Sequence, residues 1–202
     1  MTSRIRAILA FFATKVLLRI FPTFFQDLPV RSVVFAQVVN LHVPKARLGA
    51  EVGVWRGHSS IGFLRLLPNL HRLYLVDSWS NYEDYSRSGD AKSQSDFSKD
   101  QEIAKDRVYF FGQKPQIVRG FSTNVAEEIA DESLDFVFID ANHTYEYVIS
   151  DIRAWTPKVR KKGVLGGHDY GAPGHEGVKR AVDEVFGNRV NFGRDYVWWV
   201  RV

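Results

Sequence analysis

The chain has 202 residues, which is long enough for one domain with a sizeable buried core. Hydrophobic residues make up 45% of it and charged residues 25%, and no long uncharged apolar run is present, which excludes a bundle of membrane helices. There is no cysteine, which excludes disulfides and thiolate chemistry and fits a reducing compartment such as the cytoplasm.

Residues 2–25 have the pattern of an amphipathic helix, with Arg4, Lys15 and Arg19 on one helical face. The net charge of +4 comes largely from the part of the chain before Glu51. Lys15 and Arg19 interrupt the apolar run, which argues against a signal peptide. We expect this helix to dock on the domain, to join two copies into a homo-oligomer, or to make peripheral contact with a membrane surface.

From residue 48 onward, short β-rich runs alternate with helical stretches. In chain order, the pattern predicts strands at residues 48–54, 73–77, 116–119, 134–140 and 163–168. It predicts helices at residues 59–67, 101–111, 122–130, 144–155 and 177–186, with Ser122 as an N-cap. Residues 190–192 and 196–200 are expected to form a hairpin that turns at residues 193–195.

This alternation is typical of βαβ units, so we expect an α/β fold with a mostly parallel central sheet that ends in an antiparallel hairpin. Residues 47–202 would form this domain, and residues 1–46 would form an N-terminal helical extension. The polar stretch at residues 78–98 follows the second strand. As a loop, it could cover the edge of the sheet where ligands bind.

Residues 51–60 lie where the first strand turns into its helix. Gly53 and Gly57 would let the backbone approach a ligand, and the helix N-terminus would offer N–H groups to a carboxylate or phosphate. The spacing differs from the G-x-G-x-x-G fingerprint, which argues against a nicotinamide-dependent oxidoreductase. Glycines at such a turn can also be purely structural.

Asp77 ends the second strand, where a carboxylate can accept the hydroxyl hydrogens of a ribose. Trp79 could stack on a base, and Ser122 adds a polar group after the third strand. Taken singly, Asp77 could equally be a cap and Trp79 a core or lid residue. Together these features describe a site shaped for adenosine.

Two more apolar strands end in an acidic residue with an imidazole close by. Asp140 and His143 follow the fourth strand, and His168 and Asp169 follow the fifth. The carboxyl ends of parallel strands line one edge of a sheet, and ligands bind at that edge. We therefore expect Asp140 and Asp169 to meet at one site.

The ordered motifs E-V-G-V-W-R-G-H-S-S, L-V-D-S-W, L-D-F-V-F-I-D-A-N-H-T-Y, K-K-G-V-L-G-G-H-D-Y and G-V-K-R-A-V-D-E-V-F carry a resemblance. Between residues 48 and 187 the chain resembles S-adenosylmethionine-dependent methyltransferases with the Rossmann-like fold. It is most similar to the branch of macrolide-sugar O-methyltransferases, and more distantly to catechol O-methyltransferase. The resemblance implies a methyltransferase sandwich and S-adenosylmethionine as the cofactor.

The resemblance also implies roles for single residues. Glu51 and the two glycines of the first turn would shape the methionine end, Ser59 would face its carboxylate, and Asp77 would hold the ribose. The residues implied to bind the cofactor are Glu51, Gly53, Trp55, Gly57, Ser59, Asp77, Ser78, Trp79, Ser122 and Asp140.

A divalent metal, magnesium in most relatives, is implied at Asp140, His168 and Asp169. Here His168 departs from the family, because the sugar-modifying relatives carry a carboxylate at that position. Magnesium prefers oxygen ligands, whereas imidazole suits zinc, iron, nickel or manganese. Two alternatives stay open: His168 lies behind the ligands, or the site works without a metal, with Asp140 on the cofactor and Asp169 on the acceptor.

His143, Asp140 and Asp169 are the predicted catalytic residues. His143 lies at the position where catechol O-methyltransferase has its lysine base, and an imidazole can accept a proton from an attacking hydroxyl. The alternative is a histidine that only bonds Asp140 or the backbone at a helix start. His168 is the reserve base, and His58 and His175 are lesser candidates.

The resulting hypothesis is an O-methyltransferase acting on a small-molecule or glycan acceptor, preferably a sugar hydroxyl. A catechol or phenolic acceptor and a non-catalytic module that binds an adenosyl ligand remain alternatives. No specific nucleic-acid partner is expected, because the basic residues cluster in the N-terminal extension and not around the site. We expect a cytoplasmic protein, with membrane association through residues 2–25 as an option.

Overall fold

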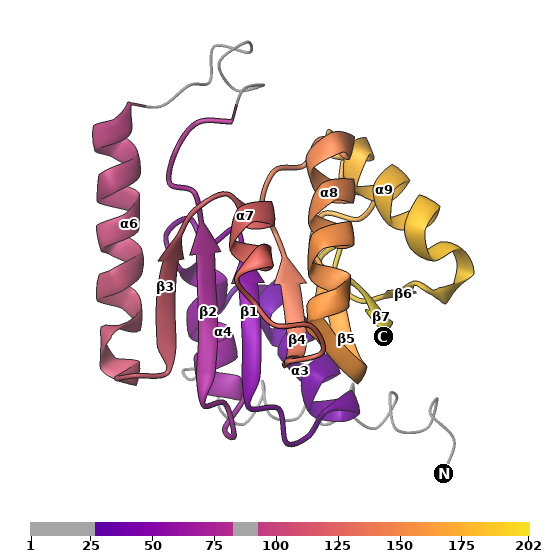
Figure 1. Ribbon diagram of the computed structural model, residues 1–202, viewed down its shortest axis with the longest axis horizontal. Helices are drawn as coiled ribbons and strands as arrows, with labels where there is room; N and C mark the ends of the chain where they lie inside the picture. The colour runs from indigo at the N-terminus through magenta and orange to yellow at the C-terminus, as the bar shows by residue number, and fades with distance from the viewer. Residues whose placement is uncertain (1–26, 83–92) are drawn as a thin grey trace.

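A twisted sheet lies at the centre of the computed structural model, which describes residues 27–82 and 93–202 (Figure 1). Within these residues, seven strands are ordered β3-β2-β1-β4-β5-β7-β6. The strands β1 to β5 are parallel, whereas β7 is antiparallel to both β5 and β6. Their bounds are β1 (Leu48–Val52), β2 (Arg72–Asp77), β3 (Pro115–Arg119), β4 (Leu134–Ile139), β5 (Val159–Gly167), β6 (Asn191–Phe192) and β7 (Trp198–Arg201). The predicted fold class is confirmed.

Helices cover both faces of the sheet (Figure 1). One buried cluster contains side chains of α3, α4 and α6, and the other contains side chains of α7, α8 and α9. The α-helices are α3 (Val30–His42), α4 (His58–Leu66), α6 (Gln94–Val108), α7 (Ser122–Glu127), α8 (Tyr145–Trp155) and α9 (Glu176–Phe186). Short 3-10 turns are η1 (Tyr109–Phe111), η2 (Thr156–Lys158) and η3 (Gly187–Arg189).

Strand β4 shows how the two helical layers share one sheet. All six of its residues are buried. Phe136 and Phe138 pack with α3 and α4, while Val137 and Ile139 pack with α7, α8 and α9, as expected for side chains that alternate between faces. Five of the six residues are apolar, as expected for a strand covered on both faces, which is why this run stands out in the sequence. The exception is Asp135, whose Oδ2 accepts the backbone N–H groups of Arg47 and Leu48.

Helix α3 packs into the core through Phe35, whose ring centroid lies 5.9 Å from that of Phe63 and 4.8 Å from that of Phe138. Gly62 explains how closely α3 approaches α4, because a β-carbon at Gly62 would lie 2.1 Å from Ser32 Oγ. The first turn of α3 is thereby held beside the first turn of α4.

The predicted extension at residues 1–46 includes α3, and the helix predicted at residues 2–25 lies outside the described residues. Within residues 27–82 and 93–202, no helix has the length and hydrophobicity needed to cross a lipid bilayer. The predicted boundary at residue 46 stays a prediction.

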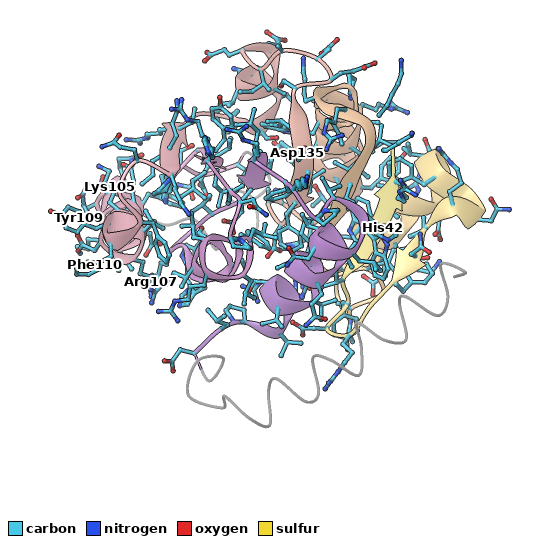
Figure 2. All side chains as sticks on the ribbon, turned by 90° about the horizontal axis from the view of Figure 1, so that it is seen from below. His42, Lys105, Arg107, Tyr109, Phe110 and Asp135 are labelled. Carbon is cyan, nitrogen blue, oxygen red and sulfur yellow. The ribbon has the colours of Figure 1, made fainter. Side chains whose placement is uncertain are left out.

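Helix α6 begins earlier than residues 101–111, the span that the sequence pattern predicts. Ser93 Oγ accepts a hydrogen bond from the backbone N–H of Asp96 at 3.2 Å, so Ser93 is the N-cap and part of the expected loop is helical. At the other end, Figure 2 shows Tyr109 and Phe110 beside Lys105 and Arg107. Tyr109 and Phe110 are 76% and 91% exposed, so they add nothing to the core.

Among the other differences from the sequence predictions, two concern Ser122 and the start of β5. Ser122 is not an N-cap: Phe121 precedes α7 in an extended conformation, and Ser122 is already helical. Strand β5 begins at Val159, because Val159 pairs with Leu134 before a register shift in the β4–β5 ladder. The terminal hairpin of β6 and β7 is confirmed, with Asn191 paired to Trp199.

Candidate active site

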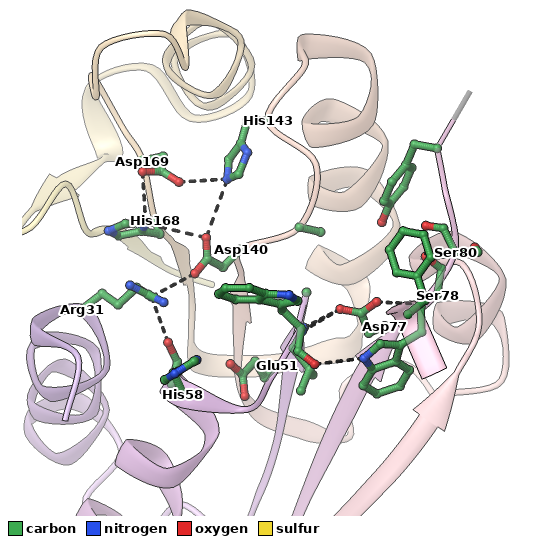
Figure 3. A pocket seen from close by; sticks show the side chains of 18 residues that line it. Arg31, Glu51, His58, Asp77, Ser78, Ser80, Asp140, His143, His168 and Asp169 are labelled. Carbon is green, nitrogen blue, oxygen red and sulfur yellow. Dashed lines mark hydrogen bonds and ion pairs between the residues drawn. The ribbon is translucent and has the colours of Figure 1, made fainter. Parts of the chain in front are cut away.

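The carboxyl ends of β1, β2, β4 and β5 surround a cavity of about 490 Å³ (Figure 3). This volume lies within the usual range for a small-molecule site. The predicted catalytic and metal residues Asp140, His143, His168 and Asp169 all line it. So do the predicted cofactor residues, with the exception of Gly57 and Ser122.

Gly53 sets the distance between the turn after β1 and the end of β4. Its φ is +90°, and a β-carbon there would lie 2.1 Å from the carbonyl oxygen of Asp140. Only glycine can occupy such a position without moving Asp140. The turn after the first strand and the end of the fourth strand are thus in direct contact.

Glu51 lies beneath this turn and is 1% exposed. Ser60 Oγ donates a hydrogen bond to its Oε2 at 2.5 Å. Burial raises the pKa of Glu51 to about 8, although the hydrogen bond from Ser60 opposes the shift. Glu51 is therefore largely protonated and uncharged at neutral pH.

Asp77 fastens two loops to the end of β2. Its Oδ2 accepts the backbone N–H groups of Val54 at 2.9 Å and Trp55 at 2.8 Å, and its Oδ1 accepts that of Trp79 at 2.7 Å. Burial raises the pKa of Asp77, and these three hydrogen bonds only partly offset the rise. With two N–H groups already on Oδ2, Oδ1 retains room for one more donor.

Trp55 and Trp79 form one wall of the cavity. The Trp79 side chain is 1% exposed, and its Nε1 donates to the carbonyl oxygen of Trp55 at 2.9 Å. Trp55 is 47% exposed, and its Nε1 donates to Asp100 Oδ2 at 2.9 Å. Trp55 thus offers an accessible ring, whereas Trp79 is a buried support.

Three residues of the cavity have a strained backbone conformation. Among the described residues, seven non-glycine residues have a positive φ, and three of them line the cavity: Trp55 at 48°, Trp79 at 42° and Asp169 at 61°. Such conformations cost energy and persist only where surrounding contacts enforce them. Their presence at one cavity is typical of a functional site.

The acidic and imidazole side chains predicted from two separate strands meet in one network (Figure 3). His143 Nε2 lies 2.8 Å from Asp169 Oδ2 and 3.8 Å from Asp140 Oδ1. His168 Nδ1 lies 3.1 Å from Asp169 Oδ1 and 3.6 Å from Asp140 Oδ1. Each imidazole therefore faces both carboxylates.

These contacts shift the titration of all four groups. Burial alone would lower the pKa of His143 and of His168, but the hydrogen bonds and charges of Asp140 and Asp169 outweigh it and raise both to about 9. Burial alone would raise the pKa of the two carboxylates, but the imidazoles hold both below the usual range. Both histidines are therefore mostly in the doubly protonated, positively charged form at neutral pH.

The same network offers ligand atoms for a metal ion. One atom each from Asp140, His168 and Asp169 lies within 4.8 Å of the others, and His143, Asp169 and His175 form a similar group. Two carboxylates and an imidazole fit a divalent ion that accepts oxygen and nitrogen, such as manganese or zinc, better than magnesium. Such an ion would have to displace the proton on His168.

Gly57 and Ser122 are the predicted cofactor residues that do not line the cavity. Gly57 has a φ of +75° and precedes α4 as its N-cap. Ser122 Oγ accepts a hydrogen bond from Trp155 Nε1 at 2.7 Å within the helical layer. Burial raises the pKa of the neighbouring Asp151 to about 7, despite its hydrogen bond with Ser122. Ser122 thus belongs to a buried polar network behind the site.

Arg31 is a cavity residue that the sequence analysis did not single out. It lies in the first turn of α3, and its Nε contacts both Ser59 Oγ at 2.9 Å and Asp140 Oδ2 at 3.1 Å. It lies in a basic N-terminal stretch, so the sequence pattern did not distinguish it from charged residues on the surface. His58 also lines the cavity, where burial and the charge of Arg107 lower its pKa.

Comparisons with known proteins identify the family of the segment that borders the cavity. A family model described as a methyltransferase domain matches residues 50–170. No curated protein matches the sequence. The matched segment runs from β1 to Tyr170, so it includes every strand end that borders the cavity.

Solved structures share the fold at low sequence identity. CalS11, a TDP-rhamnose 3'-O-methyltransferase of calicheamicin biosynthesis, is 16% identical with a TM-score of 0.61, over 93% of this chain and 86% of that one. The O-methyltransferase NovP is 20% identical with a TM-score of 0.59, over 83% and 79%. An O-methyltransferase from Bacillus cereus is 18% identical with a TM-score of 0.58, over 93% and 90%. The predicted methyltransferase resemblance is confirmed.

Proposed function

The chain belongs to the methyltransferase-domain family whose model matches residues 50–170, and from this premise we propose that it is an S-adenosylmethionine-dependent O-methyltransferase. The proposed acceptor is a hydroxyl group of a small polar molecule, preferably a sugar in a glycan or glycosylated metabolite. The observation that carries the proposal is the placement of His143, Asp140 and Asp169 in the same cavity as Asp77.

In this proposal the cofactor lies between the turn after β1 and the end of β2. Ser59 faces the methionine end, Asp77 Oδ1 accepts one ribose hydroxyl, and the exposed ring of Trp55 offers a stacking surface. Because Asp77 also accepts a hydrogen bond from the backbone of Trp55, the same carboxylate would hold the cavity wall in place and bind the ribose. Asp140 borders both this region and the acceptor end.

Methyl transfer to an alcohol needs a base, because an aliphatic hydroxyl does not lose its proton near neutral pH. S-adenosylmethionine supplies an electrophilic methyl group. His143 Nδ1, the ring nitrogen not paired with the carboxylates, would take the hydroxyl proton while the new C–O bond forms and the S–C bond breaks. Asp169 Oδ2, 2.8 Å from Nε2, would stabilise the resulting imidazolium. The products are a methyl ether, S-adenosylhomocysteine and a protonated His143.

The proton already on His143 must leave before the residue can act as a base. With a pKa of about 9, roughly one molecule in a hundred has neutral His143 at pH 7. A positive charge placed beside Asp140 would lower this pKa, because it would offset the carboxylate that stabilises the imidazolium. The reaction is therefore expected to be faster above neutral pH.

We also propose that Asp140, His168 and Asp169 can hold a divalent ion, which would polarise the acceptor oxygen and lower its pKa. The carboxylates suit magnesium, the ion that the resemblance implies, and the imidazole suits manganese or zinc. The choice between an ion-assisted and an ion-free enzyme rests on assays with EDTA and with each of the three ions.

The preference for a sugar acceptor is supported by the structural likeness to CalS11, whose description names a TDP-rhamnose 3'-O-methyltransferase. The hydrogen-bonding groups at the acceptor end, His143, His168 and Asp169, also suit a hydroxyl-rich ligand. The same proposal includes a cytoplasmic location, which the cysteine-free composition favours. It also includes peripheral membrane contact through residues 2–25, supported by the basic amphipathic pattern of that segment.

The test uses S-adenosylmethionine with an isotope-labelled methyl group and three acceptor types: nucleotide sugars, free glycans and catechols. Label in a sugar, with release of S-adenosylhomocysteine, is the expected result. If only the catechol is labelled, the acceptor is a phenolic compound and not a sugar. Binding of S-adenosylhomocysteine without turnover of any acceptor would favour a non-catalytic binding module.

A further inference from the structure

Arg31 places a guanidinium group inside the cavity, between the first turn of α4 and Asp140 (Figure 3). Its Nε hydrogen-bonds Ser59 Oγ at 2.9 Å and lies 3.1 Å from Asp140 Oδ2. Within residues 27–82 and 93–202, its two terminal nitrogens make no hydrogen bond. Four N–H donors are thus left for a ligand.

The position of Arg31 follows from helix packing and not from a local motif. Gly62 lets α3 approach α4 so closely that Ser32 Oγ occupies the space of its missing β-carbon. Ser32 Oγ is itself fixed by a hydrogen bond of 2.8 Å to the carbonyl oxygen of Pro29. Arg31 is consequently held at the start of two helices that both border the cavity.

A guanidinium with free terminal nitrogens matches the two oxygens of a carboxylate, and such paired hydrogen bonds are stronger than neutral ones. Ser59 Oγ lies beside it, and the N-terminus of α4 adds a favourable dipole for an anion. Glu51, the nearby carboxyl group under the turn, is bonded to Ser60 and does not occupy Arg31. These donors converge on the end of the cavity next to the β1 turn.

We propose that Arg31 binds the carboxylate of the methionine moiety of S-adenosylmethionine. This assignment rests on the proposed function and adds to it a cofactor-binding residue from outside the matched segment at residues 50–170. Ser59 supports Arg31 from α4, and Asp140 balances its charge while the carboxylate is absent.

The experiment is calorimetric titration with two ligands that differ by one group. S-adenosylhomocysteine carries the carboxylate, and S-adenosyl-3-thiopropylamine is the same molecule without it. The proteins are the wild type, Arg31→Ala, Arg31→Gln and Arg31→Lys, all as the full chain. Arg153→Ala is the matched control, because Arg153 pairs with Glu184 on the surface, 67% exposed and remote from the cavity.

Arg31→Ala is expected to weaken S-adenosylhomocysteine binding about 10- to 100-fold and to change binding of the decarboxylated ligand less than about 2-fold. Arg31→Lys should retain part of the affinity, and Arg153→Ala all of it. If Arg31→Ala does not fold, Arg31→Gln and Arg31→Lys give the same comparison.

An equal loss for both ligands would overturn the assignment and make Arg31 a structural residue. Unchanged affinity for S-adenosylhomocysteine, with a raised KM for an acidic acceptor, would move Arg31 to the acceptor. A wild type that binds neither ligand would refute the proposed function itself, and with it this assignment, and is distinguished from the other two outcomes by the unmutated protein alone.

Discussion

Asp169 Oδ2 lies 2.8 Å from His143 Nε2, although the two residues follow different strands. The pairing is possible because β4 and β5 are parallel neighbours, with Ile139 opposite Gly167 at their carboxyl ends. Asp169 reaches His143 with a positive φ of 61°, a conformation that costs energy outside glycine. We infer that the fold sustains this strain to place a carboxylate against the imidazole.

Replacement of His143 by alanine removes the proposed base. We expect kcat to fall about 10²- to 10⁴-fold, while the affinity for S-adenosylhomocysteine changes little. The matched control is His71→Ala, since His71 is an exposed residue that contacts Arg47 far from the cavity. Wild-type turnover in His143→Ala, measured with the best acceptor, would remove His143 from the mechanism.

The pH dependence of the rate follows from the raised pKa of His143. Only the neutral imidazole accepts a proton, so kcat/KM for the acceptor should rise with pH toward about 9. Asp169→Asn removes one carboxylate that raises this pKa. We expect kcat/KM of Asp169→Asn to rise at lower pH than in the wild type and to reach a lower maximum. If kcat/KM of Asp169→Asn rises at the same pH as in the wild type, Asp169 does not set the pKa of His143.

The stability of the ligand-free protein should also depend on pH. The pKa values of His143 and His168 are about 9 in the fold and about 6.5 when unfolded, so the folded state binds these protons more tightly. Their stabilising contribution is complete below about pH 6.5 and is lost as the pH rises through about 9. Thermal unfolding between pH 6 and 10 checks this. A Tm in His143→Ala that falls as steeply as in the wild type would contradict the assignment.

Asp77→Asn tests the carboxylate that fastens the loops. An amide NH₂ in place of one oxygen would face backbone N–H donors of Trp55 or Trp79, so we expect a loss of about 1–3 kcal/mol in the free energy of unfolding. S-adenosylhomocysteine should bind at least about 10-fold more weakly. Asp131→Asn, which alters a surface pair with Lys158, is the control. Retention of both stability and affinity would refute this role.

Gly53→Ala tests the contact between the first turn and Asp140. Gly174→Ala is a matched control, because Gly174 also has a positive φ, of +82°, but no atom lies within 4 Å of its absent β-carbon. In both variants, alanine at a positive φ destabilises the fold by about 1–2 kcal/mol. Only Gly53→Ala adds a clash with Asp140, so it should unfold at lower denaturant and bind S-adenosylhomocysteine more weakly. Equal losses in the two variants would show that this contact is unimportant.

The strand ends could be predicted from the sequence because they depend on local patterns. The apolar run of β4 followed by Asp140, and the run of β5 followed by His168 and Asp169, place these residues at one edge once the sheet is parallel. Their distances confirm that they meet. The motif order that resembles methyltransferases carried the same information at the level of the family.

Other features of the site depend on contacts that no local pattern reveals. The partners of Asp77 are backbone N–H groups on two loops, and no sequence pattern marks such partners. The position of Asp77 at a strand end therefore suggested a ligand contact but not its role in holding the two loops. Arg31 enters the cavity through the packing of α3 on α4 at Gly62. Ser122 turns toward Trp155 because α8 packs against α7. The cap at Ser93 was present in the sequence, but the polar composition around it favoured a loop.

The central claim is that the cavity binds S-adenosylmethionine and acts on it at His143. The most direct measurement is calorimetric titration of the wild type with S-adenosylhomocysteine and, separately, with NAD, each with EDTA and with added divalent ions. Micromolar binding of S-adenosylhomocysteine and none of NAD is the predicted result, and tighter binding with an ion would bear on Asp140, His168 and Asp169. Binding of NAD alone, or of neither ligand, would contradict the account.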